Sequence, residues 1–359
     1  MAVSVIVDNL PAAAVRPGLS PLAELTAHLH AHTEREHHPQ IRPGDGSGPG
    51  PELTEQMHQW SPLWAAYQAR FLFPAGPQPG RALADELADV ADLPLDRFAE
   101  HAGYALRGGN SGPPLDALLH DTGQQQHLRR AARLRSTSRR ELTEQLLDGP
   151  GAFRADLLEF LARYAEACFD AEWQRLHPRL LAETHRLGIR LRDRDVATAL
   201  AELSPSATVL DQPRRVLLDK MHSGIVRLGR RPCLVVPSHY CRPHLLVKHE
   251  PGWPVVIQYG VPTAGGAAEP SLALLRSRLQ TLADPARIRL CRLIAREALT
   301  TVDLAQRSGM TEPQVSRHLR QLRDVTLVRP ERDGRLVHYQ LDLEAIRNLG
   351  LDLEHAIYR

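Results

Sequence analysis

Apolar residues recur every three to four positions through most of residues 20–203, and this spacing predicts amphipathic helices. Ser20 is a plausible N-cap for the first helix. Further stretches with the pattern are 52–73, 81–90, 94–106, 114–120, 139–148, 151–176 and 195–203. We expect a break near His177–Pro178, because proline lacks a backbone donor.

After residue 207 the pattern changes to short β-branched runs separated by Pro, Gly and Asp, which favours strands. We predict an antiparallel sheet or meander there, joined by a first strand over residues 1–8. The small-residue stretch 261–270 is typical of a linker. The predicted class is therefore α+β, with a mainly helical N-terminal domain carrying this sheet (1–262), a linker (263–270) and a C-terminal domain (271–359).

Residues 301–320, TVDLAQRSGMTEPQVSRHLR, have the pattern of a helix-turn-helix. Gly309 suits the turn between the two helices. Thr311 and Gln314 have the spacing of a capping box at the start of the second helix. That helix has an apolar stripe at Val315, Leu319 and Leu322.

The flanking segments complete a winged helix. Asp284–Pro285 predicts a helix start upstream, with Asp284 as N-cap. Downstream, strand-like runs at 327–329 and 336–339 enclose Asp333–Gly334, a two-residue hairpin signal. Arg332 and Arg335 flank the hairpin tip.

Three motifs in residues 275–341 together resemble the ArsR family of winged-helix regulators: LADPARIR, PQVSRHL and DGRLVHYQL. The N-terminal part is similar to a helical-plus-β domain of unknown function that precedes ArsR-type winged helices in actinobacterial regulators, through Ser20–Leu25, Leu234–Ser238 and the strand ending at Tyr259. The resemblance implies a homodimeric, DNA-binding transcriptional regulator, often a repressor released by a ligand. Catalytic residues are not expected, because the sequence has no Gly-rich phosphate loop, G-x-S-x-G elbow or H-E-x-x-H motif. The scattered cysteines fit a reducing compartment, so we expect a cytoplasmic protein.

Bound to double-stranded DNA, such a dimer would place its two reading helices in successive major grooves of an inverted-repeat operator. Arginine commonly reads guanine and glutamine suits adenine, while phosphates attract arginine without regard to sequence. The expected DNA-binding residues are Gln314, Ser316, Arg317 and His318 at base edges, Thr311, Arg320, Arg332 and Arg335 mainly at phosphates, and Gln321 on the same helix.

The charge distribution agrees with this hypothesis. Residues 271–340 hold 13 Arg against 7 acids, whereas the whole chain is only +2. Such a concentration of positive charge is typical of a phosphate-binding module. The four scattered cysteines do not suggest a disulfide framework. We expect no membrane span, because no apolar run approaches about 18–20 residues.

The family's usual metal sites are not expected here. Its Cys-x-Cys pair would fall at Thr300 and Val302, which cannot replace thiolates. Its last-helix site would use Asp342, Glu344, His355 and Tyr358, and tyrosine is a poor zinc ligand. We therefore expect no metal ion and no cofactor.

Two histidine clusters leave metal binding open as an alternative. One spans His28–His38, and the other comprises His239, Cys241, His244 and His249, with His239 and Cys241 expected on one strand face. Neither spacing is a recognised ligand set, so solvated or hydrogen-bonded side chains are the simpler interpretation.

Two further alternatives remain. The winged helix can serve as a protein-interaction module, because fold does not fix function. A small-molecule effector would need a pocket in the N-terminal domain, and the aromatic side chains at helical spacing there fit such a pocket or a core. These side chains are Trp60, Trp64, Tyr67, Phe71, Phe160 and Trp173.

Overall fold

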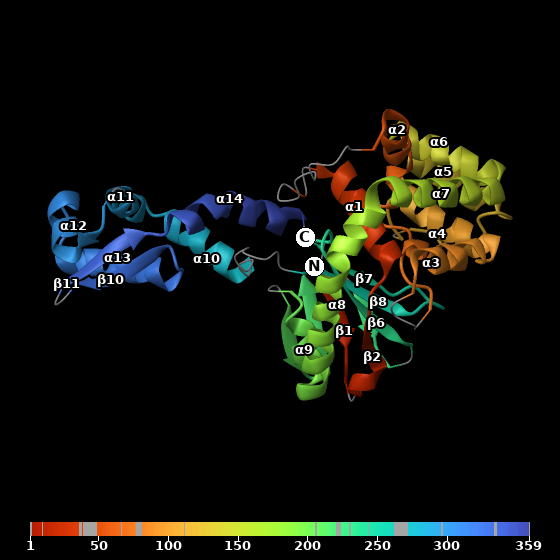
Figure 1. Cartoon of the computed structure of the whole chain (residues 1–359). Coiled ribbons are helices and arrows are strands. Elements are labelled where there is room, and N and C mark those ends of the chain that lie inside the picture. The colour runs from red at the N-terminus through yellow and green to blue at the C-terminus, as the bar shows by residue number, and fades with distance from the viewer. Residues whose placement is uncertain are drawn as a thin grey trace. The chain divides into compact units, whose positions relative to one another are not determined.

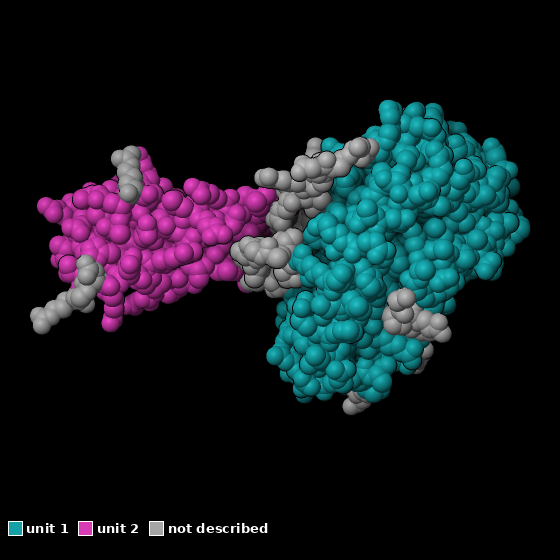
Figure 2. All heavy atoms as spheres, viewed as in Figure 1, with its two compact units in different colours: residues 1–266 teal, residues 267–359 magenta. Residues whose placement is uncertain are grey.

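The computed structural model forms two compact units, Met1–Gly266 and Ala267–Arg359, and each is described by itself (Figure 2). The residues that it describes are 2–8, 10–35, 38, 49–65, 67–76, 81–110, 112–204, 207–219, 224–229, 231–242, 244–261, 272–295, 297–333 and 336–358. Within them, no helix is both long and apolar enough to cross a lipid bilayer.

The first unit contains a helical layer (Figure 1). Its buried interior includes many aromatic side chains. Ser20 caps its first helix as predicted, because its hydroxyl accepts from the Ala23 N–H at 3.0 Å. The helices are α1 (Pro21–Thr33), α2 (Pro51–Trp60), α3 (Leu83–Ala91), α4 (Leu95–Arg107), α5 (Thr122–Arg133), α6 (Thr137–Asp148), α7 (Pro150–Tyr164), α8 (Asp170–Asp193) and α9 (Val196–Ala201). Short 3-10 turns lie at Ala12–Ala14, Ser61–Leu63 and Arg70–Leu72.

Three helix predictions were wrong. The predicted stretch 52–73 is α-helical only in α2, and 3-10 turns with irregular backbone follow Trp60. Residues 116–120 form turns, and the regular helix is α5, directly after them. The chain also does not break at His177–Pro178: α8 runs through Pro178, and the irregular segment is a π-helix at Ala165–Phe169. Pro178 has no N–H to donate to the Gln174 carbonyl. Both residues are exposed, so water can take that place.

The aromatic side chains that could have lined a pocket belong to the core. Trp60, Trp64, Phe71 and Phe160 are buried in one cluster, and Tyr67 and Trp173 pack against it. Trp60 meets Phe153 edge-on with ring centroids 4.9 Å apart, and Phe71 stacks on Phe98 at 4.6 Å. These aromatic residues therefore do not support an effector pocket.

Among the described residues, the strands of the first unit form two four-stranded sheets, with orders β3-β4-β1-β5 and β2-β6-β8-β7. The strands are β1 (Ala2–Ile6), β2 (Val15–Pro17), β3 (Thr208–Asp211), β4 (Arg214–Asp219), β5 (Gly224–Arg227), β6 (Cys233–Ser238), β7 (Leu245–Lys248) and β8 (Val255–Gly260). The predicted N-terminal strand is confirmed as β1.

The prediction of one antiparallel meander was wrong, because both sheets are mixed. β1 lies between β4 and β5, antiparallel to the first and parallel to the second. β2 and β8 both run parallel to β6. The N-terminal strands insert beside strands remote in sequence, so the local run of strands does not determine their partners.

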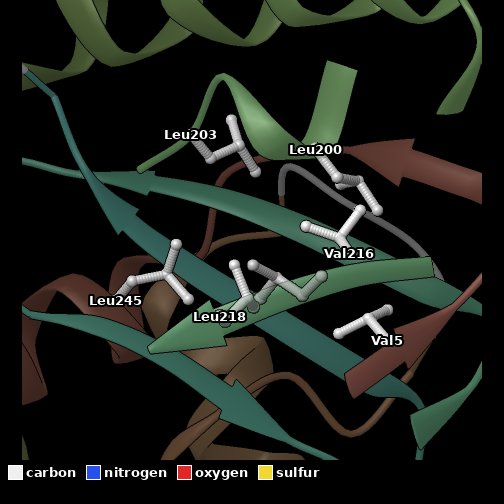
Figure 3. A pocket seen from close by; sticks show the side chains of 7 residues that line it. Val5, Leu200, Leu203, Val216, Leu218 and Leu245 are labelled. Carbon is white, nitrogen blue, oxygen red and sulfur yellow. The ribbon is translucent and has the colours of Figure 1, made fainter. Parts of the chain in front are cut away.

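Apolar side chains from both sheets and α9 meet in a close-packed interior (Figure 3). They are Val5, Leu200, Leu203, Val216, Leu218, Leu245 and Ile257. The space between them does not admit a water molecule. This region is therefore core and not a ligand cavity.

The second unit has the predicted winged-helix fold, which confirms the α+β class for the chain. Its elements are α10 (Leu272–Leu282), α11 (Pro285–Ile294), β9 (Leu299–Thr300), α12 (Thr301–Ser308), α13 (Glu312–Asp324), β10 (Val328–Asp333), β11 (Leu336–Leu341) and α14 (Leu343–Tyr358). The three strands pair in the order β10-β11-β9, and one apolar cluster joins them to the helices.

Candidate nucleic-acid interface

Side-chain caps fix where the helices of the second unit begin. The Asp284 carboxylate accepts from the Ala286 N–H at 2.8 Å, which confirms Asp284 as N-cap of α11. That hydrogen bond, together with the positive charge of Arg287, lowers the pKa of Asp284. Thr300 and Asp303 form a reciprocal capping box at the start of α12.

Gly309 ends α12 in the left-handed region, with φ +72°, and its N–H donates to the Ala305 carbonyl at 3.1 Å. Two residues later Thr311 begins the turn into α13, where its N–H donates to Gln314 Oε1 at 2.9 Å. This contact belongs to the predicted capping box between Thr311 and Gln314.

The second helix, α13, has one buried side and one exposed side. Val315, Leu319 and Leu322 are buried against the core of the unit, as predicted. The predicted DNA-binding residues on its exposed side are Thr311, Gln314, Ser316, Arg317 and Arg320. With about 100° between successive residues, Arg317 lies nearly opposite Val315.

The structure places two of the predicted residues against α11 instead. Gln321 is exposed, but its Oε1 accepts from Arg287 Nη1. The His318 side chain is only 15% exposed, and its Nδ1 lies 3.9 Å from Asp284 Oδ2. These contacts fix the orientation of α13 on α11.

The wing is formed by β10 and β11. Their pairing runs from Val328–Leu341 to Asp333–Leu336, so Asp333 is the last paired residue of β10 and not a turn residue. Arg332 is exposed in β10, whereas Arg335 lies outside the described residues. At the base of the wing, Arg329 Nε donates to Asp342 Oδ2 at 2.7 Å.

The arginines of this unit differ in whether an acid neutralises them. Arg278, Arg287, Arg307 and Arg329 each form a salt bridge with a carboxylate of another segment or of a helix start. Among the described residues, Arg317, Arg320 and Arg332 form no salt bridge. Their charge therefore remains available on α13 and the wing.

Sequence reasoning missed two arginines that hold the interface in shape. Arg278 is buried, and its guanidinium donates to the Val325 carbonyl at 3.1 Å and to Thr326 Oγ1 at 2.7 Å, while Asp352 Oδ2 lies 3.4 Å away. It thus joins α10, the end of α13 and α14. Arg287 also donates to the Thr281 carbonyl at 2.5 Å. Arg278 has no local sequence signal, because its partners lie 47 to 74 residues away. Arg287 belongs to the LADPARIR motif, but its contact with Gln321 of α13 spans 34 residues and has no such signal.

The family's metal positions serve other purposes here. The Thr300 hydroxyl donates to Asp303 Oδ2 at 2.6 Å within the capping box. Asp342 accepts from the Ala345 N–H at 3.0 Å as well as from Arg329, and these contacts outweigh partial burial and lower its pKa. The side chains of His355 and Tyr358 lie outside the described residues.

Comparison with known proteins gives matches to both parts of the chain. A family model described as "Family of unknown function (DUF5937)" matches residues 1–265, and a "Helix-turn-helix domain" model matches residues 282–331. The HTH-type transcriptional regulator NmtR of Mycobacterium tuberculosis is 37% identical over 86 residues, which are 24% of this chain and 69% of that protein.

Two other regulators are similar over a shorter share of their length. KmtR of M. tuberculosis, an HTH-type transcriptional regulator, is 38% identical over 79 residues (21% of this chain, 61% of KmtR). A transcriptional repressor SmtB homolog of Synechocystis is 44% identical over 68 residues (19% of this chain, 52% of the homolog). The chain thus spans about half to two thirds of these relatives. A solved ArsR-like regulator from Rhodococcus is 24% identical, with a TM-score of 0.23, over 23% of this chain and 79% of that protein.

The chain belongs to the ArsR family and, through residues 1–265, to the family of unknown function. Two predictions from the sequence are therefore confirmed: membership of the ArsR family and the winged helix. The N-terminal resemblance is confirmed at the level of a family whose function is not known.

Proposed function

We propose that this ArsR-family protein is a sequence-specific DNA-binding regulator of transcription that acts in the cytoplasm and has no catalytic role. The observation that carries the proposal is the position of Arg317 and Arg320 on the exposed side of α13, with Arg332 on the adjacent wing, all without an acidic partner among the described residues. Their guanidinium groups suit guanine edges and phosphates.

The reading surface in this proposal consists of Gln314, Ser316 and Arg317 at base edges, with Thr311, Arg320, Arg332 and Arg335 at phosphates. His318 and Gln321 would act mainly by holding α13 on α11, given their contacts with Asp284 and Arg287. The names of the relatives, which include a transcriptional repressor, support repression as the sign of regulation.

We further propose a homodimer that binds an inverted repeat. The support is an apolar surface on α10 and α14, which lie side by side (Figure 1) and expose Leu272, Leu279, Leu353 and Ile357. A two-fold axis through this surface would place the two α13 helices in successive major grooves, about 34 Å apart. A small-molecule effector remains part of the proposal, with no pocket assigned to it.

The test is binding of the full-length protein to the DNA upstream of its own gene, titrated with competitor DNA and salt. Saturable, competitor-resistant binding to a short inverted repeat is expected, and Arg332→Ala or Arg335→Ala should each reduce the slope of log affinity against log salt by about one. Indifference to DNA at low salt would contradict the proposal and favour a protein-interaction module.

A further inference from the structure

Three histidine side chains from separate segments meet inside the first unit. His30 lies on α1, His38 follows that helix, and His244 directly precedes β7. Their ring centroids form a nearly equilateral triangle, with separations of 5.0 Å (His30–His38), 5.4 Å (His30–His244) and 5.3 Å (His38–His244). The fold therefore unites members of the two histidine clusters seen in the sequence.

The ring nitrogens lie close enough together to bind one metal ion after small movements. One nitrogen from each ring lies within 4.8 Å of the other two. Tetrahedral Zn²⁺ with Zn–N bonds of about 2.0–2.1 Å holds its ligands about 3.4 Å apart, so each nitrogen would move by less than about 1 Å. Side-chain rotation alone can supply such a movement.

The backbone of each histidine is held in place by neighbouring residues. The His30 carbonyl accepts from the Glu34 N–H at 2.8 Å, and the His38 N–H donates to the Arg35 carbonyl at 3.1 Å. The His244 N–H donates to the Cys241 carbonyl at 2.7 Å, and the Cys241 thiol donates to the His244 carbonyl at 3.2 Å. These hydrogen bonds hold the backbone segments that carry the three rings.

The cluster lies in the interior of the first unit. His30 and His38 are 6% and 4% exposed, whereas His244 is only partly buried. An ion bound there would be largely enclosed by the unit.

We propose that His30, His38 and His244 bind one divalent transition-metal ion of the Zn²⁺ class. Neutral imidazole suits Zn²⁺ and its first-row neighbours, whereas Mg²⁺ and Ca²⁺ prefer oxygen. Three imidazoles leave a fourth position for water or an anion. The ion would join the end of α1 to the segment before β7, and this site is separate from the α13 surface in residues and in chemistry.

The test uses full-length protein stripped of metal with a chelator and needs no DNA, so its failure would leave the DNA-binding proposal unaffected. Zn²⁺ affinity is measured by competition with a chromophoric chelator, and Co²⁺ supplies a visible absorption spectrum. We expect one tight equivalent of Zn²⁺ per chain and the intense Co²⁺ bands of a four- or five-coordinate site.

His244→Gln should weaken this equivalent at least 100-fold and abolish the Co²⁺ bands. His249→Gln is the matched control, because His249 follows β7 at the other end and is not in the triangle. Circular dichroism checks that each variant is folded. If His244→Gln is misfolded, His38→Gln takes its place and should show the same loss of Zn²⁺ affinity. Equal affinities for His244→Gln and His249→Gln, or binding of Zn²⁺ only at millimolar concentration, would overturn the proposal.

Discussion

At the residue scale, Arg317 combines exposure with an unneutralised charge on the side of α13 opposite its buried stripe. We expect Arg317→Ala to weaken binding to the specific site by about 1–3 kcal/mol and to relax the sequence preference, because a bidentate contact with a base edge is lost. The measurement compares affinities for the operator and for single-base variants at one salt concentration.

Arg323 provides the matched control on the same helix. It lies about a third of a turn around the helix from Arg317 and within 3.7 Å of Asp324. Arg323→Ala should therefore retain the sequence preference. If Arg317→Ala weakens binding equally to every sequence, Arg317 contacts the DNA backbone and does not read bases.

A second residue-scale prediction concerns Glu86 of the first unit. Burial raises the pKa of Glu86 to about 7 from its usual 4.5, although its Oε2 accepts from the Leu22 N–H and the Ser20 hydroxyl. Because the folded pKa is above the unfolded one, this carboxyl stabilises the fold below about pH 4.5, and that contribution is lost as pH rises through about 7.

Glu86→Gln should therefore become more stable relative to the wild type as pH increases from 4.5 to 7, by up to about 3 kcal/mol. Urea unfolding followed by tryptophan fluorescence measures this difference, since Trp60, Trp64, Trp173 and Trp253 all lie in the first unit. A difference that does not change with pH would show that Glu86 titrates normally.

At the element scale, Gly309 makes the turn between α12 and α13 possible. Its φ of +72° is unfavourable for a residue with a side chain, although no atom lies within 4 Å of an added Cβ. Gly309→Ala should thus destabilise the second unit by about 1 kcal/mol through backbone strain alone. Gly309→Asn should cost less, because asparagine tolerates this conformation.

The readout is unfolding followed by far-UV circular dichroism, which reports the helices of both units. Tryptophan fluorescence identifies the transition of the first unit, and the remaining change in dichroism then belongs to the second unit. If Gly309→Ala and Gly309→Asn lower the stability of the second unit equally, the effect arises from helix packing and not from the left-handed conformation.

The same elements show why sequence predicted the second unit better than the first. The winged helix depends on caps and turns formed by residues a few positions apart, such as Thr300 with Asp303. The N-terminal sheets depend on β1 and β2, whose partners lie about 200 residues away. Pairing at that distance leaves no periodic signal in a single sequence.

The region after β6 illustrates this limit. His239 and Cys241 were expected on one strand face, but β6 ends at Ser238. Glu24 of α1 accepts from the His239 and Tyr240 N–H groups at 2.9 and 3.3 Å, and the Ser238 hydroxyl accepts from Cys241 N. These side-chain acceptors take the place of a strand ladder.

For the DNA-binding residues, the sequence pattern predicted which residues are candidates. It could not predict that His318 and Gln321 contact Asp284 and Arg287, because those contacts form only in the folded unit.

At the scale of the whole molecule, the proposed dimer predicts a link between assembly and operator binding. Ile357 is 62% exposed and shares an open surface of α14 with Arg347, Gly350, Leu351, Leu353 and Glu354. Exposed apolar surface of this kind marks an interaction site more often than chance. Ile357→Glu should place a charge in the interface and shift the protein from dimer to monomer in sedimentation experiments.

The matched control is Ile225→Glu, since Ile225 is 67% exposed on β5 of the first unit. We expect Ile225→Glu to remain dimeric and Ile357→Glu to lose affinity for the two-half-site operator while keeping its affinity for one half-site, because the reading surface is unchanged. If Ile225→Glu instead produces the monomer, the N-terminal unit holds the dimer together. In that case the two winged helices would be held near each other through residues 1–266, and the operator spacing would depend on that unit and not on α10 and α14.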